Sequence, residues 1–480
     1  MNPFPFRAGG RAVLRRSLLV ALLAAILVSF VAAPLAAAEP PDERLERLER
    51  LEQEVAALRE ALAQLAAAAP APAPAAAPDA VELAELARRV DLLAEELETL
   101  RVGEAAVKAE VSERGFGPAA SKIYRAHDGL SVGGYGEIVY QNWDRQRDDG
   151  TPSGRTAEAD VLRGVVYFGY KWSDRWLLNT ELEFEHGSTG DGGEASIEFA
   201  YLDHLWRDEL SFRAGLLLIP MGFLNELHEP TTFLGSRRPG VESALIPSTW
   251  REVGLGVHGE VGPWTYRTYL VNGLDAADFS AAGIRSGRQK GARAKAEDLA
   301  WTGRLDYTAL PGLLAGGSAF VGDSGQGLRD PAGGRVGRVR TALFEGHLEW
   351  KWRGLELRAL GVRGSIGGVA ALNRARGLTG LRSVGERQEG GYVEAGFDLF
   401  SLGASANQAL VPFARYERYD TQARVPAGFA RNPANDVEVL TLGLVWKPLA
   451  QVVFKLDWQD VDNRAGTGVN QWNLALGYIF

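Results

Sequence analysis

The residues with the clearest capacity for chemistry are charged side chains gathered in one long segment between two apolar stretches. Residues 220–251, with the adjoining Glu252, hold basic and acidic groups close together. In a narrow, low-dielectric passage, opposed fixed charges focus the electric field and bias which ions enter. We therefore expect a pore constriction with arginines on one wall and the acids nearby, formed by Arg237, Arg238, Arg251, Glu242 and Glu252. The alternative is that these are solvated loop charges that only deter aggregation.

A second set of charged residues occupies every other position of the apolar stretches. Glu181 and Glu183, for example, alternate with Leu182 and Phe184. Side chains that alternate in this way point to opposite faces of a strand. Because unpaired ions are costly to bury without water, we expect this face to line a water-filled lumen. The candidate lumen residues are Arg163, Glu181, Glu183, Arg213, Arg267, Arg304, Asp306, Arg358, Arg415 and Lys455.

Other kinds of chemistry find little support. Cysteine is absent, which excludes disulfides and thiolate metal sites, and the six histidines show no metal-ligand spacing. Residues 144–150 resemble a calcium loop only loosely, because the segment carries arginines. We can place no Ser/His/Asp arrangement, and the net charge of −9 offers no basic face for nucleic acid. We expect no catalytic residue, no metal, no cofactor and no nucleic-acid partner.

The stretches that carry these residues predict strands, because the hydrophobic period is two from Leu130 onward. An even number of strands lets an antiparallel sheet close, and sixteen are enough to leave an aqueous channel. The sixteen expected strands lie near 130–142, 160–172, 175–186, 194–206, 209–219, 252–261, 263–273, 299–309, 311–322, 338–351, 353–364, 389–400, 408–419, 435–447, 450–460 and 468–480.

The connections between these strands alternate between short and mostly long. Residues 173–174 and 262 are short links, whereas 220–251 and 274–298 are long. Short turns on one side and long loops on the other are typical of outer-membrane barrels, and aromatic residues at the strand ends fit the girdles of such barrels. We therefore expect an all-β fold: a 16-stranded antiparallel transmembrane β-barrel over 128–480. The 365–388 loop, rich in arginine, is a second candidate for an infolded loop.

The N-terminal quarter differs in period and composition. Residues 1–38 have the basic start, the apolar segment and the small-residue cleavage site of a signal peptide, against the alternative of a membrane anchor. Leucines at alternating spacings of three and four predict an acidic periplasmic helical coiled coil over 39–114, with an Ala/Pro spacer at 66–78. A single amphipathic helix folded against the barrel is the other interpretation. A linker is expected over 115–127.

Several segments resemble the phosphate-selective porin O and P family of bacterial outer-membrane porins. The resemblance spans about 128–480 and is sharpest in Gly134–Glu137, Phe212–Phe233, Ile246–Gly254 and Leu270–Asp275, with a terminal Phe480. It implies a sixteen-stranded barrel, usually a homotrimer, narrowed by an infolded third loop. It also implies that the outer-membrane assembly machinery recognises Phe480, and an N-terminal coiled coil is common in relatives. The chain has only eight lysines and an inner face of mixed sign, so the resemblance supports a porin more strongly than it supports phosphate.

The leading hypothesis is passive diffusion of small hydrophilic solutes or ions, anions such as phosphate among them, through a pore in contact with outer-membrane lipid and lipopolysaccharide. A second hypothesis makes the barrel a structural anchor whose stalk tethers the membrane to the cell wall. A third, a lipolytic or proteolytic barrel, lacks any catalytic arrangement, so we expect no enzyme.

Overall fold

The computed structural model describes residues 109, 111–126, 129–190, 192–403 and 408–480. The chain divides into two units, Met1–Gly103 and Glu104–Phe480, and all the described residues belong to the second. The predicted signal peptide, the spacer and nearly all of the predicted stalk therefore lie outside the described residues. Among the described residues, no helix is long and apolar enough to cross a membrane.

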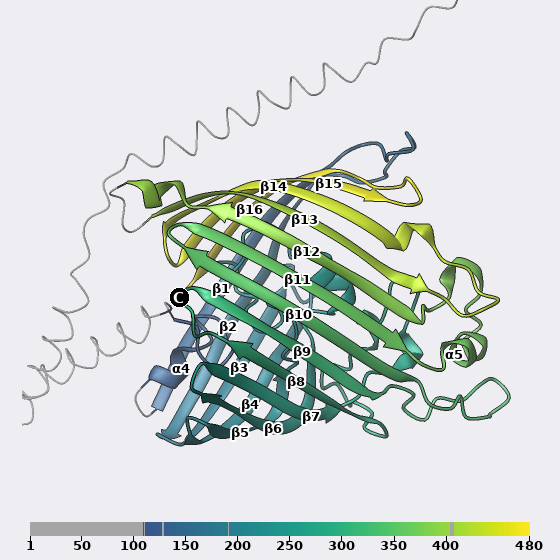
Figure 1. Ribbon diagram of the computed structural model, residues 1–480, viewed down its shortest axis with the longest axis horizontal. Helices are drawn as coiled ribbons and strands as arrows, with labels where there is room; N and C mark the ends of the chain where they lie inside the picture. Colours follow the sequence, from purple (N-terminus) through teal and green to yellow (C-terminus); the bar gives the residue numbers. More distant parts are fainter. Residues whose placement is uncertain (1–108, 110, 127–128, 191, 404–407) are drawn as a thin grey trace, which may run out of the picture. The chain divides into compact units, whose positions relative to one another are not determined.

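The described strands form one closed antiparallel barrel in which each strand pairs with its neighbours in sequence and β1 pairs with β16 (Figure 1). This confirms the predicted fold class. The strands are β1 (Gly129–Trp143), β2 (Glu158–Ser173), β3 (Trp176–Glu185), β4 (Ala195–Arg207), β5 (Leu210–Leu218), β6 (Arg251–Val261), β7 (Trp264–Asn272), β8 (Leu299–Tyr307), β9 (Leu313–Asp323), β10 (Arg340–Trp352), β11 (Leu355–Ile366), β12 (Arg387–Phe397), β13 (Ala409–Arg424), β14 (Asp436–Leu449), β15 (Val452–Asn463) and β16 (Gln471–Ile479).

All sixteen expected strands are present, and most of their ends differ by one to three residues. The largest difference is in β13, which was expected to end at 419 and ends at Arg424. There the strand continues because Arg424 pairs with Arg387 of β12 across a register shift. A partner strand, which local sequence does not reveal, therefore sets where β13 stops.

The two ends of the barrel differ. Connections after even-numbered strands are short, with the link at 398–408 as the longest of them, and we call their side the turn end. Connections after odd-numbered strands lie at the loop end and include loop L3 (residues 219–250) and loop L4 (residues 273–298). The C-terminus and helix α4 (Lys122–Arg125) are at the turn end, and helix α5 (Val369–Ala375) is at the loop end (Figure 1).

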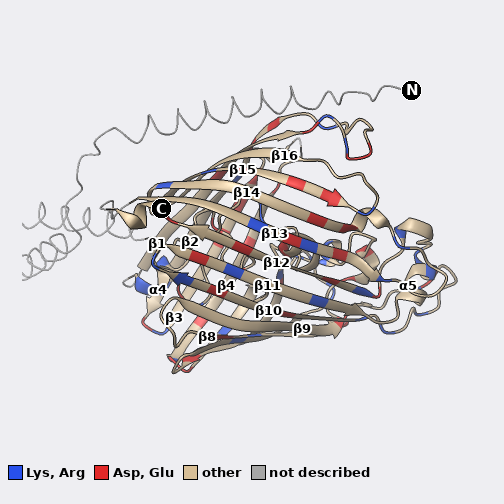
Figure 2. Cartoon of the chain, turned by 45° about the horizontal axis from the view of Figure 1, so that its top comes forward, with Lys and Arg blue, Asp and Glu red and all other residues tan. Residues whose placement is uncertain are grey.

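The barrel wall has an apolar outer face and a polar inner face. Along β3, for example, Leu182 and Phe184 are exposed on the outside, whereas Glu181 and Glu183, which alternate with them, are buried inside. Basic and acidic segments are interspersed along the strands (Figure 2). Exposed tryptophans flank the turns, as in aromatic girdles: Trp172, Trp176, Trp206, Trp264, Trp350 and Trp352. This polarity suits a wall surrounded by lipid.

The largest apolar cluster lies inside the barrel. It combines inward-facing residues of the strands, such as Phe199 and Tyr201 of β4, with Met221 and Trp250 of L3 and with Phe116 from the segment before β1. Leu274 and Phe279 of L4 also belong to it, so apolar side chains of the strands meet those of several non-strand segments in the lumen.

Candidate functional site in the barrel lumen

Loop L3 folds into the lumen and is held by contacts on several sides of the barrel. Lys455 of β15 donates to the carbonyl oxygens of Phe233 and Gly235 at 2.8 and 3.0 Å, and Arg358 of β11 donates to that of Thr232 at 2.7 Å. Wall side chains thus satisfy backbone groups of L3 that would otherwise be buried without partners. This places the expected infolded loop across the interior.

The opposite part of L3 is anchored to other strands. Glu417 of β13 accepts from the backbone N–H of Val241 at 3.1 Å, at the start of the short π-helix η1 (Val241–Leu245). Glu242 lies within η1, where its carboxylate accepts from Tyr392 Oη and from the N–H of Leu224 at 2.7 Å each. L3 is therefore a fixed element of the lumen.

An arginine-rich cavity of about 410 Å³ lies between L3, L4 and the inner wall. Its lining includes Arg163 of β2, Arg237 and Arg238 of L3 and Arg285 of L4, with Glu137 of β1 as the only carboxylate. Five serines also line the cavity: Ser236, Ser243, Ser248, Ser280 and Ser286. We call this the arginine cavity.

Charge in the arginine cavity is only partly balanced. Arg163 pairs with Glu137 at 3.4 Å and Glu183 at 3.7 Å. Arg237 instead donates to the neutral side chain of Gln141 at 3.2 Å, and Arg238 reaches the carbonyl oxygen of His228 at 3.4 Å. No ion pair is recorded for either arginine within the described parts of the chain. Two half-buried arginines thus face the cavity without a carboxylate partner.

Arg285 adds a third cation held by neutral groups. Its guanidinium donates to the carbonyl oxygens of Ser243, at 3.0 Å, and of Ser248. Burial, and then repulsion from Arg288 and Arg238, lower the pKa of Arg285 to about 9, so it remains charged at neutral pH. Burial likewise lowers the pKa of Arg237 and Arg238. An anion in the cavity would relieve this repulsion.

The five constriction candidates do not lie together. Arg237 and Arg238 line the arginine cavity, whereas Glu242 is turned toward Tyr392 and is fully buried. Arg251 pairs with Glu198 at 2.5 Å. Glu252 accepts from the side chain of Asn272 at 2.6 Å and from the N–H of Gln289 at 3.0 Å. Glu242, Arg251 and Glu252 therefore bond to other residues of the loops and the wall and do not line the arginine cavity.

The ten candidate lumen residues all face inward and all have polar partners among the described residues. The partners are Glu183 for Arg163, His228 for Glu181, Asp203 for Arg213, Glu226 and Asp306 for Arg267, Asp306 for Arg304, Glu349 for Arg358, Glu394 and Glu417 for Arg415, and backbone carbonyls for Lys455. Opposite charges and L3 carbonyl groups, brought close by the fold, satisfy these charges.

Sequence reasoning missed Arg285 and Glu137 as parts of the site. Arg285 lies on L4, which was treated only as a long connection, and Glu137 was noted only within the Gly134–Glu137 motif. The alternation along β1 could have identified Glu137, since it is one of the inward positions of that strand. No local signal identifies Arg285. The arginines of the 365–388 loop do not join the site: Arg374, Arg376 and Arg382 are exposed at the loop end.

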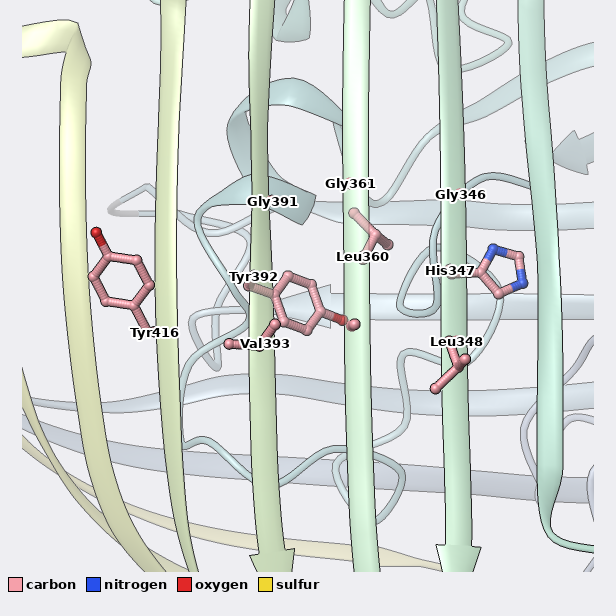
Figure 3. A pocket seen from close by; sticks show the side chains of 10 residues that line it. Gly346, His347, Leu348, Leu360, Gly361, Gly391, Tyr392, Val393 and Tyr416 are labelled. Atoms are coloured by element: carbon pink, nitrogen blue, oxygen red, sulfur yellow. The ribbon is translucent and has the colours of Figure 1, made fainter.

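A shallow groove of about 530 Å³ follows the barrel wall rather than the lumen (Figure 3). Gly346, Gly361 and Gly391 pair with one another across β10, β11 and β12. Because glycine has no side chain, these three positions leave a hollow bordered by Leu348, Val393 and Tyr416. Its exposed apolar border faces outward, so it is not part of a solute path.

No protein-family model matches the sequence. Among solved structures, the outer-membrane channel DcaP of Acinetobacter baumannii is 13% identical, with a TM-score of 0.46, over 73% of this chain and 97% of its own. OmpF of Salmonella typhi in complex with daunomycin is 11% identical, with a TM-score of 0.45 and the same coverage. A loop-deletion mutant of the Vibrio cholerae outer-membrane protein OmpT is 10% identical, with a TM-score of 0.46, over 73% of this chain and 99% of its own.

A much stronger similarity is to a protein of Aquifex aeolicus (strain VF5) that is described as an uncharacterized protein. The two sequences are 34% identical over 377 residues, which cover 76% of this chain and 83% of the Aquifex protein. The matched length is greater than the whole barrel, so the two proteins share more than a motif. The chain belongs to the same protein family as this Aquifex aeolicus protein.

Proposed function

We propose that the protein is a porin-like channel of the bacterial outer membrane that passes small hydrophilic solutes and favours anions. The closed barrel with its apolar outer face supports a place in a bilayer, because closure leaves no unpaired strand edge in lipid. The mixed charges of the interior suit a path for polar solutes, so the proposed role is transport.

The observation that carries the anion preference is the arginine cavity. It presents four guanidinium groups and one carboxylate, and Arg237 and Arg238 have no acidic partner among the described residues. Guanidinium groups bind phosphate and carboxylate through charge-assisted hydrogen bonds. Oxyanions such as phosphate therefore fit the lining, whereas a cation would meet a net positive field.

The remaining parts of the proposal concern the orientation, export and assembly of the barrel. The turn end would face the periplasm and the loop end the exterior. Phe480 lies at the turn end, where its backbone N–H donates to Gly134 at 2.9 Å while its side chain stays exposed. We propose that the assembly machinery binds this residue and that residues 1–38 direct export. We also propose a homotrimer in contact with lipopolysaccharide, with residues 39–108 as its periplasmic coiled coil; residues 111–114 of the predicted stalk form no helix.

Planar-bilayer recordings test this function. The folded full-length protein should give discrete conductance steps, and the reversal potential in a KCl gradient should show that chloride is more permeant than potassium. Added phosphate should reduce the chloride current if both ions use the arginine cavity. Absence of steps from correctly folded protein would overturn the channel, and a cation-selective reversal potential would overturn the anion preference alone.

A second candidate function is a structural tether to the cell wall. The dense pairing of charged side chains inside the barrel favours it, because a filled interior leaves little room for solutes and an anchor needs none. Removing residues 39–78 should then weaken the envelope and leave solute uptake unchanged. Uptake that falls while the envelope stays intact would count against the tether.

A further inference from the structure

The segment before β1 enters the barrel and packs against its inner wall. We call residues 111–126 the strap; it includes helix α4 and the described part of the expected linker at 115–127. Its contacts lie near the turn end of β1 to β5. Lys122 Nζ donates to the carbonyl oxygen of Val132 at 2.9 Å, and Asn179 Nδ2 donates to that of Ala120 at 3.0 Å.

Aromatic contacts seat the strap against β4. The ring of Phe116 lies 5.1 Å from that of Phe199 and 5.4 Å from that of Tyr201, and Phe116 is 2% exposed. The guanidinium of Arg213 lies 4.9 Å from the ring centre of Phe116. An aromatic side chain in this environment excludes water from the inner wall. The strap therefore fills lumen space at the turn end that would otherwise be wet.

The strap is also joined to L3. Both oxygens of the Glu229 carboxylate accept from the N–H of Ala119, at 3.0 and 3.2 Å, and Oε1 accepts from the N–H of Ala120 at 3.0 Å. The fit is close, since a Cβ at Gly117 would lie 2.5 Å from the carboxyl carbon of Glu229. One L3 side chain thus connects the strap to the element that crosses the lumen.

The barrel closes without any contribution from the strap. β1 pairs with β16 from Tyr135 to Trp143, and the strap supplies no strand to the sheet. All its bonds to the wall come from side chains or single backbone groups. It can therefore leave the lumen without opening the wall, which is the requirement for a movable part inside a rigid barrel.

We propose that the strap is an internal gate: docked, it closes the turn end of the lumen, and undocked, it opens a path to the arginine cavity. This inference rests on the proposed channel function. The strap immediately precedes β1 at the turn end, so its only covalent continuations are the N-terminal part of the chain and the wall itself. Displacement of the N-terminal part is thus a direct way to withdraw the strap.

A disulfide across the strap and the wall tests the gate, because the chain has no cysteine of its own. A Cβ built at Gly169, on the inner face of β2, lies 3.0 Å from Cβ of Ile123. Disulfides need about 3.5–4.5 Å between these atoms, so a small shift in I123C/G169C suffices. The full-length double variant is recorded in bilayers before and after reduction, with I123C and G169C alone as controls.

We expect the oxidised double variant to show at least a tenfold lower open probability than the same protein after reduction, with both single variants insensitive to reductant. Equal open probability in a protein shown by mass spectrometry to be cross-linked would overturn the gate. A wild-type protein and a variant lacking 111–126 that both fail to conduct would overturn the channel function itself. The two failures are therefore distinguishable.

A second variant tests the gate from the opposite direction. G117A introduces a methyl group against the Glu229 carboxylate and should raise the open probability severalfold. The matched control is G361A on the outer wall, where an added Cβ meets nothing within 4 Å. An unchanged open probability in correctly folded G117A protein would contradict the proposed docking.

Discussion

The carboxylate of Glu229 on L3 accepts a hydrogen bond from the N–H of Ala120, a residue 109 positions earlier in the chain, at 3.0 Å. Burial raises the pKa of Glu229 to about 7, although the N–H groups of Ala120 and Ala119 and the nearby His228 act to lower it. Glu181 and Tyr167 face the same carboxyl group from β3 and β2. Protonation at this position is therefore linked to the stability of the folded barrel with its strap in place.

The sign of the linkage follows from the raised pKa. A carboxyl group whose pKa is raised in the folded protein stabilises the fold while it is protonated, and that stabilisation is lost as the pH rises through the folded pKa. For Glu229 the loss extends from its ordinary value of 4.5 to about 7. The folded protein should therefore be less resistant to urea at pH 8 than at pH 5, as unfolding titrations across this range would show.

The E229Q variant distinguishes the titration of Glu229 from that of the titratable groups around it. Glutamine keeps an acceptor oxygen for Ala119 and Ala120 and does not ionise, so this part of the stability should not change between pH 5 and pH 8. His228, which bonds Glu181 at 3.1 Å, retains its own titration in the variant. We expect the loss of stability between pH 5 and pH 8 to shrink in E229Q, and a pH response equal to that of the wild type would rule out Glu229 as its source.

The arginine cavity predicts the effect of reversing single charges. R237E should reduce the permeability ratio of chloride to potassium by about fivefold or more, because a change of about 1 kcal/mol in an ion's energy corresponds to about that factor. Reversal potentials in asymmetric KCl measure the ratio. R382E is the matched control, since Arg382 is exposed in the 365–388 loop. Equal shifts in the two variants would show that overall charge, not the cavity, sets selectivity.

The strands could be predicted because the residues of each strand alternate in polarity between its outer and inner faces. In β3, the alternation of Leu182 and Phe184 with Glu181 and Glu183 shows two faces of opposite polarity, whatever the partner strands are. The same pattern identified the inward-facing charges. It does not reveal their partners, because the pairing of Glu181 with His228 depends on the course of L3 through the lumen.

The strap and L4 could not be predicted for a related reason. Residues 115–127 have no strand or heptad period, which favoured a linker, and the partners of Phe116, namely Phe199 and Tyr201, are far away in sequence. Arg285 likewise joins the arginine cavity through the carbonyl groups of L3. Contacts between irregular segments leave no periodic signal in either of them.

The buried pair of Arg213 and Asp203 predicts a large stability effect. Arg213 Nε lies 2.7 Å from Asp203 Oδ1, and neither side chain is more than 2% exposed. R213M leaves the aspartate buried without its charge partner, which costs about 3–5 kcal/mol. Urea unfolding in detergent should show this loss, and D203N/R213M should recover part of it.

R418M, at an exposed ion pair, is the control for the loss of stability expected of R213M. Arg418 pairs with Asp436 at 3.3 Å, but its side chain is 48% exposed, so removal should cost less than about 1 kcal/mol. If R213M and R418M unfolded at the same urea concentration, the interior at Arg213 would have to be as wet as the surface. The filled turn end of the lumen would then be wrong.

The orientation of the wall predicts opposite outcomes for two leucine substitutions. Leu255 is 62% exposed at the middle of β6, on the outer face, so L255R would place a charge in the hydrocarbon layer. Such substitutions cost about 2–4 kcal/mol at the bilayer midplane and about 0–1 near the interfaces. Leu402 is 76% exposed in the link between β12 and β13 at the turn end, so L402R should be nearly neutral. Folding into lipid vesicles, followed by urea titration, measures both, and equal stability of the two variants would mean that the outer face of β6 is not in contact with lipid.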